Sequence, residues 1–290
     1  MEAPLVSVVM ATFNESAEYI TASVESILNQ NYQNWELIIA DDSTRLETVS
    51  VIDSLAGRDN RIFVLRHSER MGFVCALNEG LKRARGKYIA RMDGDDISLP
   101  DRFQREVDYL ERHEEVSVLG GAMNIINKKG EIVSYRNYPQ KGMKLLLWSI
   151  LRNPLAHPTV MFRSAIVQSG MYYDVKQKKA EDIEFWLRLQ KNGYQIENLP
   201  NTILNYRVEG DLSLKRNKEQ WKYNFIARKK NFNWNHPLCS SLSIIISFLF
   251  ILVPSSVIRR IYRQENSDAG CGCCWKDTLL LGWFCQVCRI

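Results

Sequence analysis

Four short apolar runs, each followed by a segment of helical periodicity, constrain the fold of this chain more than any other feature. The runs cover residues 5–10, 35–40, 61–65 and 87–92. Such runs are typical of strands that are buried on both faces of a sheet. Between them, apolar residues such as Ile20, Val24 and Ile27 recur at helical spacing. Because strands that alternate with helices join through right-handed crossovers, the sequence predicts an α/β fold with a doubly wound, mostly parallel sheet.

Length, composition and charge limit the possible functions. At 290 residues and 46% hydrophobic content, the chain can bury a large core. Its 38 basic and 33 acidic residues give a net charge of +5, too small and too dispersed to indicate a nucleic-acid partner. The first four residues lack the basic segment that opens a secretory signal, so we expect the catalytic part to stay in the cytosol.

Polar loops follow three of the predicted strands. The first strand leads into residues 11–14, which include Ala11 and Phe13, the second into residues 41–43, which include Asp42, and the fourth into residues 93–96. Ligands of doubly wound sheets bind beyond the carboxyl ends of the strands, where the strand order reverses. We therefore expect the three loops to converge on one crevice.

The loop after the fourth predicted strand contains Asp93, Asp95 and Asp96. Three crowded carboxylates repel one another unless a cation neutralises them, and Mg²⁺ or Mn²⁺ accepts such oxygen ligands while also binding substrate phosphates. Asp and Gly are also ordinary turn residues, and Asp95 or Asp96 can simply cap the following helix. Two further acidic positions, Asp42 and the pair at 181–182, favour the metal interpretation.

No glycine-rich phosphate loop follows the first strand, which disfavours a Rossmann dehydrogenase and a P-loop enzyme. Without that loop, a metal must do more to hold a diphosphate. Asp42 can accept a hydrogen bond from the ring N–H of uracil, whereas Asp41 and Ser43 are better explained as turn or cap residues. Phe13 can stack on the base, although an aromatic residue at a strand end is more often part of the core.

A second acidic site opens a later helix. Glu181 and Asp182 precede Ile183, Trp186 and Leu189, which share one helix face. Acids in a first turn stabilise the helix dipole, which is one explanation for the pair. The other is that one of them acts as a general base that removes a proton from an incoming hydroxyl.

The C-terminal region combines basic and apolar segments. Seven basic residues lie between positions 215 and 230 against one acid, Glu219: Lys215, Arg216, Lys218, Lys222, Arg228, Lys229 and Lys230. Residues 238–258 carry no charge and are long enough to cross a bilayer, but Pro254 and six serines weaken that interpretation. We favour a helix that lies in or dips into the membrane interface over a full span or a buried core helix. Residues 214–263 then form a membrane-associating segment.

Residues 264–290 form a cysteine-rich tail with five of the seven cysteines, namely Cys271, Cys273, Cys274, Cys285 and Cys288. Cytosolic thiols stay reduced, which leaves zinc binding, lipidation or no role. Their spacing matches the usual zinc sites poorly, so we assign this tail no function.

Several ordered motifs resemble family 2 glycosyltransferases of the GT-A fold. They lie at residues 7–14, 37–43, 90–96, 99–103 and 181–182, and residues 157–163 and 206–207 are similar to bacterial members that build surface polysaccharide of the O-antigen type. The resemblance implies a GT-A domain over residues 1–213, with a nucleotide-binding half over about 1–100 and a small α+β acceptor half over about 101–213. A membrane-associated helix would follow it.

The resemblance also implies a reaction. A sugar would pass with inversion from an α-linked nucleotide sugar, most often a uridine diphosphate sugar, to a hydroxyl of a lipid-linked glycan at the cytoplasmic face of the plasma membrane. By resemblance, Asp42 binds uracil, Asp95 with Asp93 binds Mn²⁺ or Mg²⁺, and Asp182 is the base. Ala11, Phe13 and Asp93 are expected at the nucleotide, and Glu181, His157 and Arg207 near the acceptor or the diphosphate.

One position departs from the family pattern. Related enzymes often carry a histidine shortly after the Tyr-Arg pair, whereas Arg207 is followed here by Val208 and Glu209. An acid beside a phosphate is repelled unless it reaches the metal, so Arg207 is expected to take the role of the histidine.

Three other functions compete with the glycosyltransferase. A sugar-phosphate nucleotidyltransferase needs a glycine-rich loop with a basic residue after the first strand, which is absent. A glycosidase places its two carboxylates on either side of the sugar bond. A non-catalytic, membrane-associated glycan scaffold stays open as an alternative, since motifs can persist without chemistry.

Overall fold

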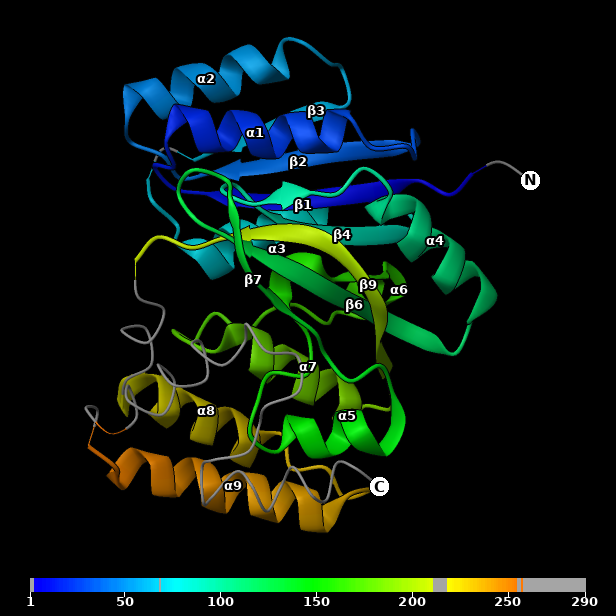
Figure 1. Ribbon diagram of the computed structural model, residues 1–290, viewed down its shortest axis with the longest axis vertical. Helices are drawn as coiled ribbons and strands as arrows, with labels where there is room; N and C mark the ends of the chain where they lie inside the picture. Colours follow the sequence, from blue (N-terminus) through cyan, green and yellow to red (C-terminus); the bar gives the residue numbers. More distant parts are fainter. Residues whose placement is uncertain (1–2, 68, 211–217, 255–256, 258–290) are drawn as a thin grey trace.

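A mixed sheet organises the computed structural model, which describes residues 3–67, 69–210, 218–254 and 257 (Figure 1). Its strand order is β3-β2-β1-β4-β8-β6-β9-β5, and β7 pairs with β6. The strands are β1 (Val6–Thr12), β2 (Trp35–Asp41), β3 (Ile62–Arg66), β4 (Tyr88–Asp93), β5 (Ile97–Ser98), β6 (Val116–Ile126), β7 (Ile132–Arg136), β8 (Met161–Arg163) and β9 (Gln195–Arg207). The helices are α1 (Ala17–Leu28), α2 (Leu46–Ala56), α3 (Phe73–Arg83), α4 (Arg102–Arg112), α5 (Gly142–Ser149), α6 (Ala165–Gln168), α7 (Glu181–Lys191), α8 (Lys218–Lys230) and α9 (Pro237–Leu252), with a short 3₁₀ helix, η1 (His157–Thr159).

The first four strands form the parallel part of the sheet, as the sequence predicts. β1 lies between β2 and β4, and all three of the pairings among β1 to β4 are parallel. The carboxyl ends of β1, β2 and β4 therefore meet at one edge. One expectation was wrong: β3 is an edge strand, and three of its five residues are half-buried, so it is not covered on both faces.

The second half of the sheet is mixed. β8 runs antiparallel to both β4 and β6, whereas β6 and β9 are parallel. β5 and β7 add antiparallel pairs with β9 and β6. The β6–β7 hairpin turns at residues 127–130, and the positive φ of Gly130 suits that turn. The sheet is therefore mixed but mostly parallel, as predicted, and each antiparallel pairing involves β5, β7 or β8.

Helices cover both faces of the sheet. On one face, Ile20 of α1, Ile52 of α2 and Phe103 of α4 join the apolar core beneath β1, β2 and β4. On the other face, Leu77 of α3 and Trp186 of α7 belong to a second core. Two cores on opposite faces confirm the doubly wound arrangement.

The last two described helices extend the second face. α8 packs against α7 and α9 packs against α8, so that α9 is the outermost element on that side (Figure 1). The predicted helix over residues 238–258 is observed as α9, which ends at Leu252. No described helix combines the length and apolarity that a bilayer crossing needs. The cysteine-rich tail over 264–290 lies outside the described residues.

Candidate active site

The three loops predicted to converge do lie against one another. The backbone N–H of Asp42 donates to the carbonyl of Thr12 at 3.1 Å. The N–H of Asn14 donates to the hydroxyl of Ser43 at 2.9 Å, and the hydroxyl of Ser23 donates to the carbonyl of Asp93 at 2.8 Å. The first two bonds join the ends of β1 and β2, and the third joins the end of β4 to α1, so the three loops are held at one edge of the sheet.

Asn14 and Asp41 hold the first two loops together. Asn14 adopts a left-handed backbone conformation with φ of 61°, which asparagine tolerates. Its side-chain oxygen accepts from the N–H groups of Thr44 and Arg45, both at 2.9 Å, at the start of α2. Asp41 is fully buried, and it accepts from Ser43 N–H at 2.9 Å and pairs with Arg66 at 2.9 Å. Asp41 thus forms a turn, and Asn14 holds the segment just before α2, whose N-terminus has no side-chain cap.

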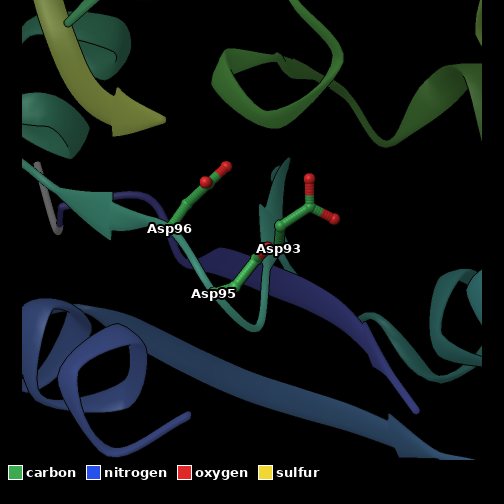
Figure 2. Close-up of side chains that lie close together, drawn as sticks. All are labelled: Asp93, Asp95 and Asp96. Carbon is green, nitrogen blue, oxygen red and sulfur yellow. The ribbon is translucent and has the colours of Figure 1, made fainter. Parts of the chain in front are cut away.

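The predicted acidic cluster is present at the tip of β4 (Figure 2). Carboxylate oxygens of Asp93, Asp95 and Asp96 all lie within 4.8 Å of one another. Asp96 is fully buried, and its Oδ1 accepts from the backbone N–H of Arg207 at 2.8 Å. Burial, together with the charges of Asp93 and Asp95, raises the pKa of Asp96 well above its ordinary value. Asp96 anchors the loop, and Asp93 and Asp95 are the more accessible members.

Glu15 is a fourth acid of this site that the sequence analysis missed. Burial raises the pKa of Glu15 to about 7, and the charges of Asp95 and Asp93 add to the rise. Its Oε2 accepts from Phe13 N–H at 2.7 Å, and its carboxyl carbon lies 3.5 Å from where a Cβ on Gly94 would stand. Glu15 directly follows the loop 11–14, so its position beyond β1 was the available signal.

The chemistry of these side chains fits a divalent cation. The raised pKa values of Glu15 and Asp96 both reflect mutual repulsion among carboxylates in addition to burial. A bound cation relieves that repulsion, and carboxylate oxygens are the ligands that Mg²⁺ and Mn²⁺ prefer. Asp93 and Asp95 are the residues that would hold it, with Asp96 behind them.

Arg91 links this cluster to α7. Its side chain is 4% exposed, and its guanidinium pairs with the carboxylate of Asp93. Nε and Nη1 of Arg91 have no hydrogen-bond partner within the described part of the chain. Burial, with a smaller effect of the Arg91 charge, lowers the pKa of His157, and the same charge partly offsets the rise that burial causes in the pKa of Glu181. Arg91 therefore interacts with both of the acidic sites that the sequence predicts.

The acidic pair at residues 181–182 opens α7, as predicted. The preceding Ala180 is left-handed with φ of 56°, a conformation that costs a non-glycine residue about 1–2 kcal/mol. Burial, followed by the charge of Asp182, raises the pKa of Glu181 to about 7. The carboxylate of Asp182 accepts from the side-chain amide of Asn153, and from Ile183 N–H at 2.8 Å. Asn153 thus orients Asp182, a role with no sequence signal.

His157 lies in the aromatic core beneath α7. Its Nε2 is 2.8 Å from the hydroxyl of Tyr173, and its ring centroid is 6.0 Å from that of Trp186. Burial, with a smaller effect of Arg91, lowers the pKa of His157 well below its ordinary value. The ring is therefore neutral at physiological pH. Its expected contact with the acceptor or the diphosphate stays a prediction.

The guanidinium of Arg207 donates hydrogen bonds to backbone carbonyls. Its Nε donates to the carbonyl of Asp95 at 2.9 Å, and its Nη1 donates to those of Asn127 and Lys128 at 3.2 Å. Glu209 accepts from the hydroxyl of Tyr19 at 3.0 Å. Arg207 thereby braces the acidic loop against the β6–β7 hairpin, and its expected contact with the diphosphate stays a prediction.

The predicted nucleotide-binding residues line the ends of β1 and β2. Asp42 is 7% exposed; its Oδ2 accepts from Gly72 N–H at 2.7 Å, and its Oδ1 has no hydrogen-bond partner among the described residues. Ala11 is buried, whereas Phe13 is 38% exposed with the guanidinium of Arg70 3.6 Å above its ring. The ends of β1 and β2 thus offer a buried acceptor atom and a partly exposed ring.

Comparison with known proteins identifies the family. The model of the family described as "Glycosyl transferase family 2" matches residues 7–170. The chain belongs to glycosyl transferase family 2. Over 210 residues it is 32% identical to the O-antigen biosynthesis glycosyltransferase WbnJ of Escherichia coli, covering 70% of this chain and 80% of that protein. It is 28% identical over 267 residues to the amylovoran biosynthesis glycosyltransferase AmsE of Erwinia amylovora, covering 90% of this chain and 98% of the relative.

Solved structures share the fold of this glycosyltransferase. The S. aureus TarS 1-349 complex with UDP-GlcNAc has a TM-score of 0.62 at 21% identity, over 78% of this chain and 66% of that one. The mannosyltransferase PcManGT of Pyrobaculum calidifontis, in complex with GDP-Man and Mn²⁺, has a TM-score of 0.65 at 15% identity, over 100% of this chain and 81% of that one. These similarities confirm the GT-A-like architecture.

Proposed function

We propose that this family 2 enzyme is an inverting, metal-dependent hexosyltransferase that uses a uridine diphosphate sugar. The observation that carries the proposal is the link that Arg91 makes between the two acidic sites. Its guanidinium pairs with Asp93 of the clustered carboxylates, and its charge acts on Glu181, the neighbour of Asp182 at the start of α7. An inverting transfer needs a counter-charge for the leaving diphosphate and a base for the attacking hydroxyl, and in this proposal each acidic site supplies one of them.

Asp42 is proposed to bind the uracil base of the donor. Its buried Oδ1 receives no hydrogen bond from the described residues, and the Nδ1 of His67 lies 3.6 Å away. In this proposal a ring N–H of uracil donates to that oxygen. Phe13 is 38% exposed, and its ring is proposed to stack on the base on the face that the guanidinium of Arg70 does not cover. The TarS structures in complex with UDP and UDP-GlcNAc support a uridine donor in a protein of this fold.

Asp95 and Asp93 are proposed to hold Mn²⁺ or Mg²⁺. When bound, the cation stabilises the negative charge of the departing diphosphate. Asp96 and Arg207 keep the loop in place through the bond from Arg207 N–H to Asp96 Oδ1. The PcManGT complex contains Mn²⁺, which supports a metal in this fold.

Asp182 is proposed as the general base, as the resemblance implies. The acceptor hydroxyl loses its proton to this carboxylate while its oxygen bonds to C1 of the sugar. The bond between C1 and the diphosphate oxygen breaks on the opposite face, so the configuration at C1 inverts. Asn153 and the N–H of Ile183 hold the Asp182 carboxylate in one orientation, which favours a fixed approach of the acceptor.

The acceptor is proposed to be a lipid-linked glycan in polysaccharide biosynthesis at the cytoplasmic face of the plasma membrane. The names of WbnJ and AmsE, which refer to O-antigen and amylovoran biosynthesis, support this class of product. In this proposal, residues 1–213 form the catalytic domain, with the nucleotide half over about 1–100 and the acceptor half over about 101–213.

The test is a panel of nucleotide sugars with purified full-length protein and a glycan acceptor linked to a lipid diphosphate. We expect nucleotide release and glycan extension with Mn²⁺ and a uridine donor, and loss of both with a chelator. Asp42→Ala should weaken uridine diphosphate binding at least tenfold in calorimetry, whereas Asp108→Ala, an exposed acid of α4, should not. Absence of metal-dependent nucleotide binding in the unaltered protein would refute the proposal.

A further inference from the structure

The polarity of α9 is the reverse of what a surface helix normally shows. Its buried residues are Ser243 and Ser247, which are 7% and 1% exposed. Their hydroxyls donate to backbone carbonyls of the same helix. The hydroxyl of Ser243 donates to the carbonyl of Ser240 at 2.8 Å, and that of Ser247 donates to the carbonyl of Ser243 at 2.8 Å. The serine face therefore packs on the protein, and the apolar side of the helix is left outside.

The outer face of α9 is a continuous apolar stripe. The exposed fractions are 84% for Leu238, 39% for Leu242, 55% for Ile245, 51% for Leu249 and 62% for Leu252. Spacings of four, three, four and three residues place all five on one side of a helix, over a length of about 21 Å. Single exposed apolar residues are ordinary, but a row of this kind on a monomer marks an interaction surface.

α8 fixes the orientation of α9. The rings of Trp221 and Phe250 stack with centroids 4.2 Å apart and planes 13° apart. Phe225 and Phe248 approach to 5.7 Å between centroids. These aromatic pairs hold α9 against α8 while Ser243 and Ser247 face inward, so the apolar stripe is the side left open to a partner. A surface that covers this face must therefore lie along the helix.

Positive charge lies on the neighbouring helix. Lys218, Lys222 and Lys229 of α8 are exposed. Glu219, the single acid in the sequence of α8, pairs with Lys179 at 2.5 Å. Trp234, in the connection between α8 and α9, is 80% exposed. Apolar side chains, lysines and an exposed tryptophan together match the boundary between lipid tails and anionic headgroups.

We propose that the outer face of α9, with the exposed lysines of α8, binds the interface of an anionic phospholipid membrane with the helix axis parallel to the membrane plane. A second copy of the chain fits less well, since it would bring the same lysines toward one another. Binding of this kind does not depend on the activity proposed above. It would hold α7, which packs against α8 and carries Asp182, on the membrane side of the enzyme.

Sedimentation with vesicles tests the proposal. We expect the full-length protein to bind vesicles of phosphatidylcholine with 30% phosphatidylglycerol, and to bind vesicles of phosphatidylcholine alone at least tenfold more weakly. The double variant Ile245→Glu with Leu249→Glu should reduce binding to the anionic vesicles at least tenfold. Lys218→Glu with Lys222→Glu should reduce it severalfold and flatten its dependence on salt.

A matched control uses the exposed apolar residues of β7. Ile132 and Val133 are 63% and 60% exposed, so Ile132→Glu with Val133→Glu alters side chains of similar exposure at another place. This variant should bind vesicles as the unaltered protein does, and thermal melting should show that all variants fold. The proposal is wrong if the α9 variant retains its binding, if the β7 variant loses it equally, or if the α9 substitutions only convert a dimer to a monomer.

Discussion

The acidic tip of β4 and the acidic start of α7 are held in different ways. At the tip, Asp93 is the last residue of a buried strand, and Asp96 accepts from the backbone N–H of Arg207. At α7, the orientation of Asp182 depends on a distant amide, that of Asn153, and on the left-handed backbone of Ala180. The tip is thus set by the sheet, whereas the α7 pair is set by side-chain contacts between separate segments.

This difference suits the two sites to different tasks, donor binding at the tip of β4 and proton transfer at the start of α7. A tip built from main-chain geometry suits a site that must keep several like charges close together, because repulsion cannot push a strand end apart easily. A carboxylate oriented by one amide suits a group that must exchange a proton with a variable acceptor. We therefore expect changes at the tip to affect donor binding and changes at α7 to affect the transfer step.

The largest expected effect comes from neutralising one acid in each site. Asp95→Asn should abolish metal-dependent nucleotide binding and lower transfer by about a thousandfold, since the leaving diphosphate loses its counter-charge. Asp182→Asn should lower kcat by about a hundredfold or more but keep nucleotide affinity within about twofold. Calorimetry and single-turnover transfer assays measure the two effects. If Asp182→Asn weakened nucleotide binding as much as Asp95→Asn, the assignment of nucleotide binding to one site and of the transfer step to the other would be wrong.

Removing Asn153 tests whether α7 depends on its distant partner. Asn153→Ala should lower kcat by about tenfold, because a misplaced base is less effective, and should leave the KM of the donor unchanged. Asn124→Ala is a suitable control, since Asn124 donates to another asparagine, Asn205, at 2.8 Å between β6 and β9. A kcat equal to that of the unaltered protein would show that Asp182 is oriented without Asn153.

The pH dependence of stability should report Glu181. Its pKa is raised from 4.5 to about 7, chiefly by burial, so between these values the folded chain binds more protons than the unfolded chain. This contribution to stability is fully present below pH 4.5 and is lost as the pH rises to 7. Because Gln cannot ionise, the Glu181→Gln variant does not lose this stability. As the pH rises from 4.5 to 7.5, its free energy of unfolding should increase by about 1–3 kcal/mol relative to that of the unaltered protein.

Urea denaturation in the presence of a chelator measures this gain. Glu114→Gln, which alters an exposed acid after α4, should show no such change with pH. Equal pH slopes for the Glu181→Gln variant and the unaltered protein would mean that Glu181 is not held in a desolvated position.

Much of the fold could be predicted from the sequence because its signals are local. The four apolar runs became β1 to β4, and Ile20, Val24 and Ile27 became the buried face of α1. The antiparallel insertion of β8 between β4 and β6 could not be predicted, since strand pairing depends on contacts far apart in the chain.

The same distinction applies to the candidate site. Asp93, Asp95 and Asp96 lie within four residues, so their clustering was visible in the sequence. Glu15 and Asn153 were not recognised, because each joins the site only when separate loops meet. The occupation of Arg207 by three backbone carbonyls was equally hidden, since carbonyl positions are a property of the folded chain.

Arg91 connects the two acidic sites, and changing it should have the smallest effect. Its guanidinium pairs with Asp93, so it competes with a cation for that carboxylate and adds repulsion toward the cation. Arg91→Met should raise Mn²⁺ affinity about fivefold, which is about 1 kcal/mol, whereas Arg91→Lys should stay near the original value. Because the charge of Arg91 lowers the pKa of Glu181, Arg91→Met should also shift the pH window of Glu181 upward. Titration with Mn²⁺ measures the first effect, and a weaker affinity in Arg91→Met would show that Arg91 instead presents Asp93 to the metal.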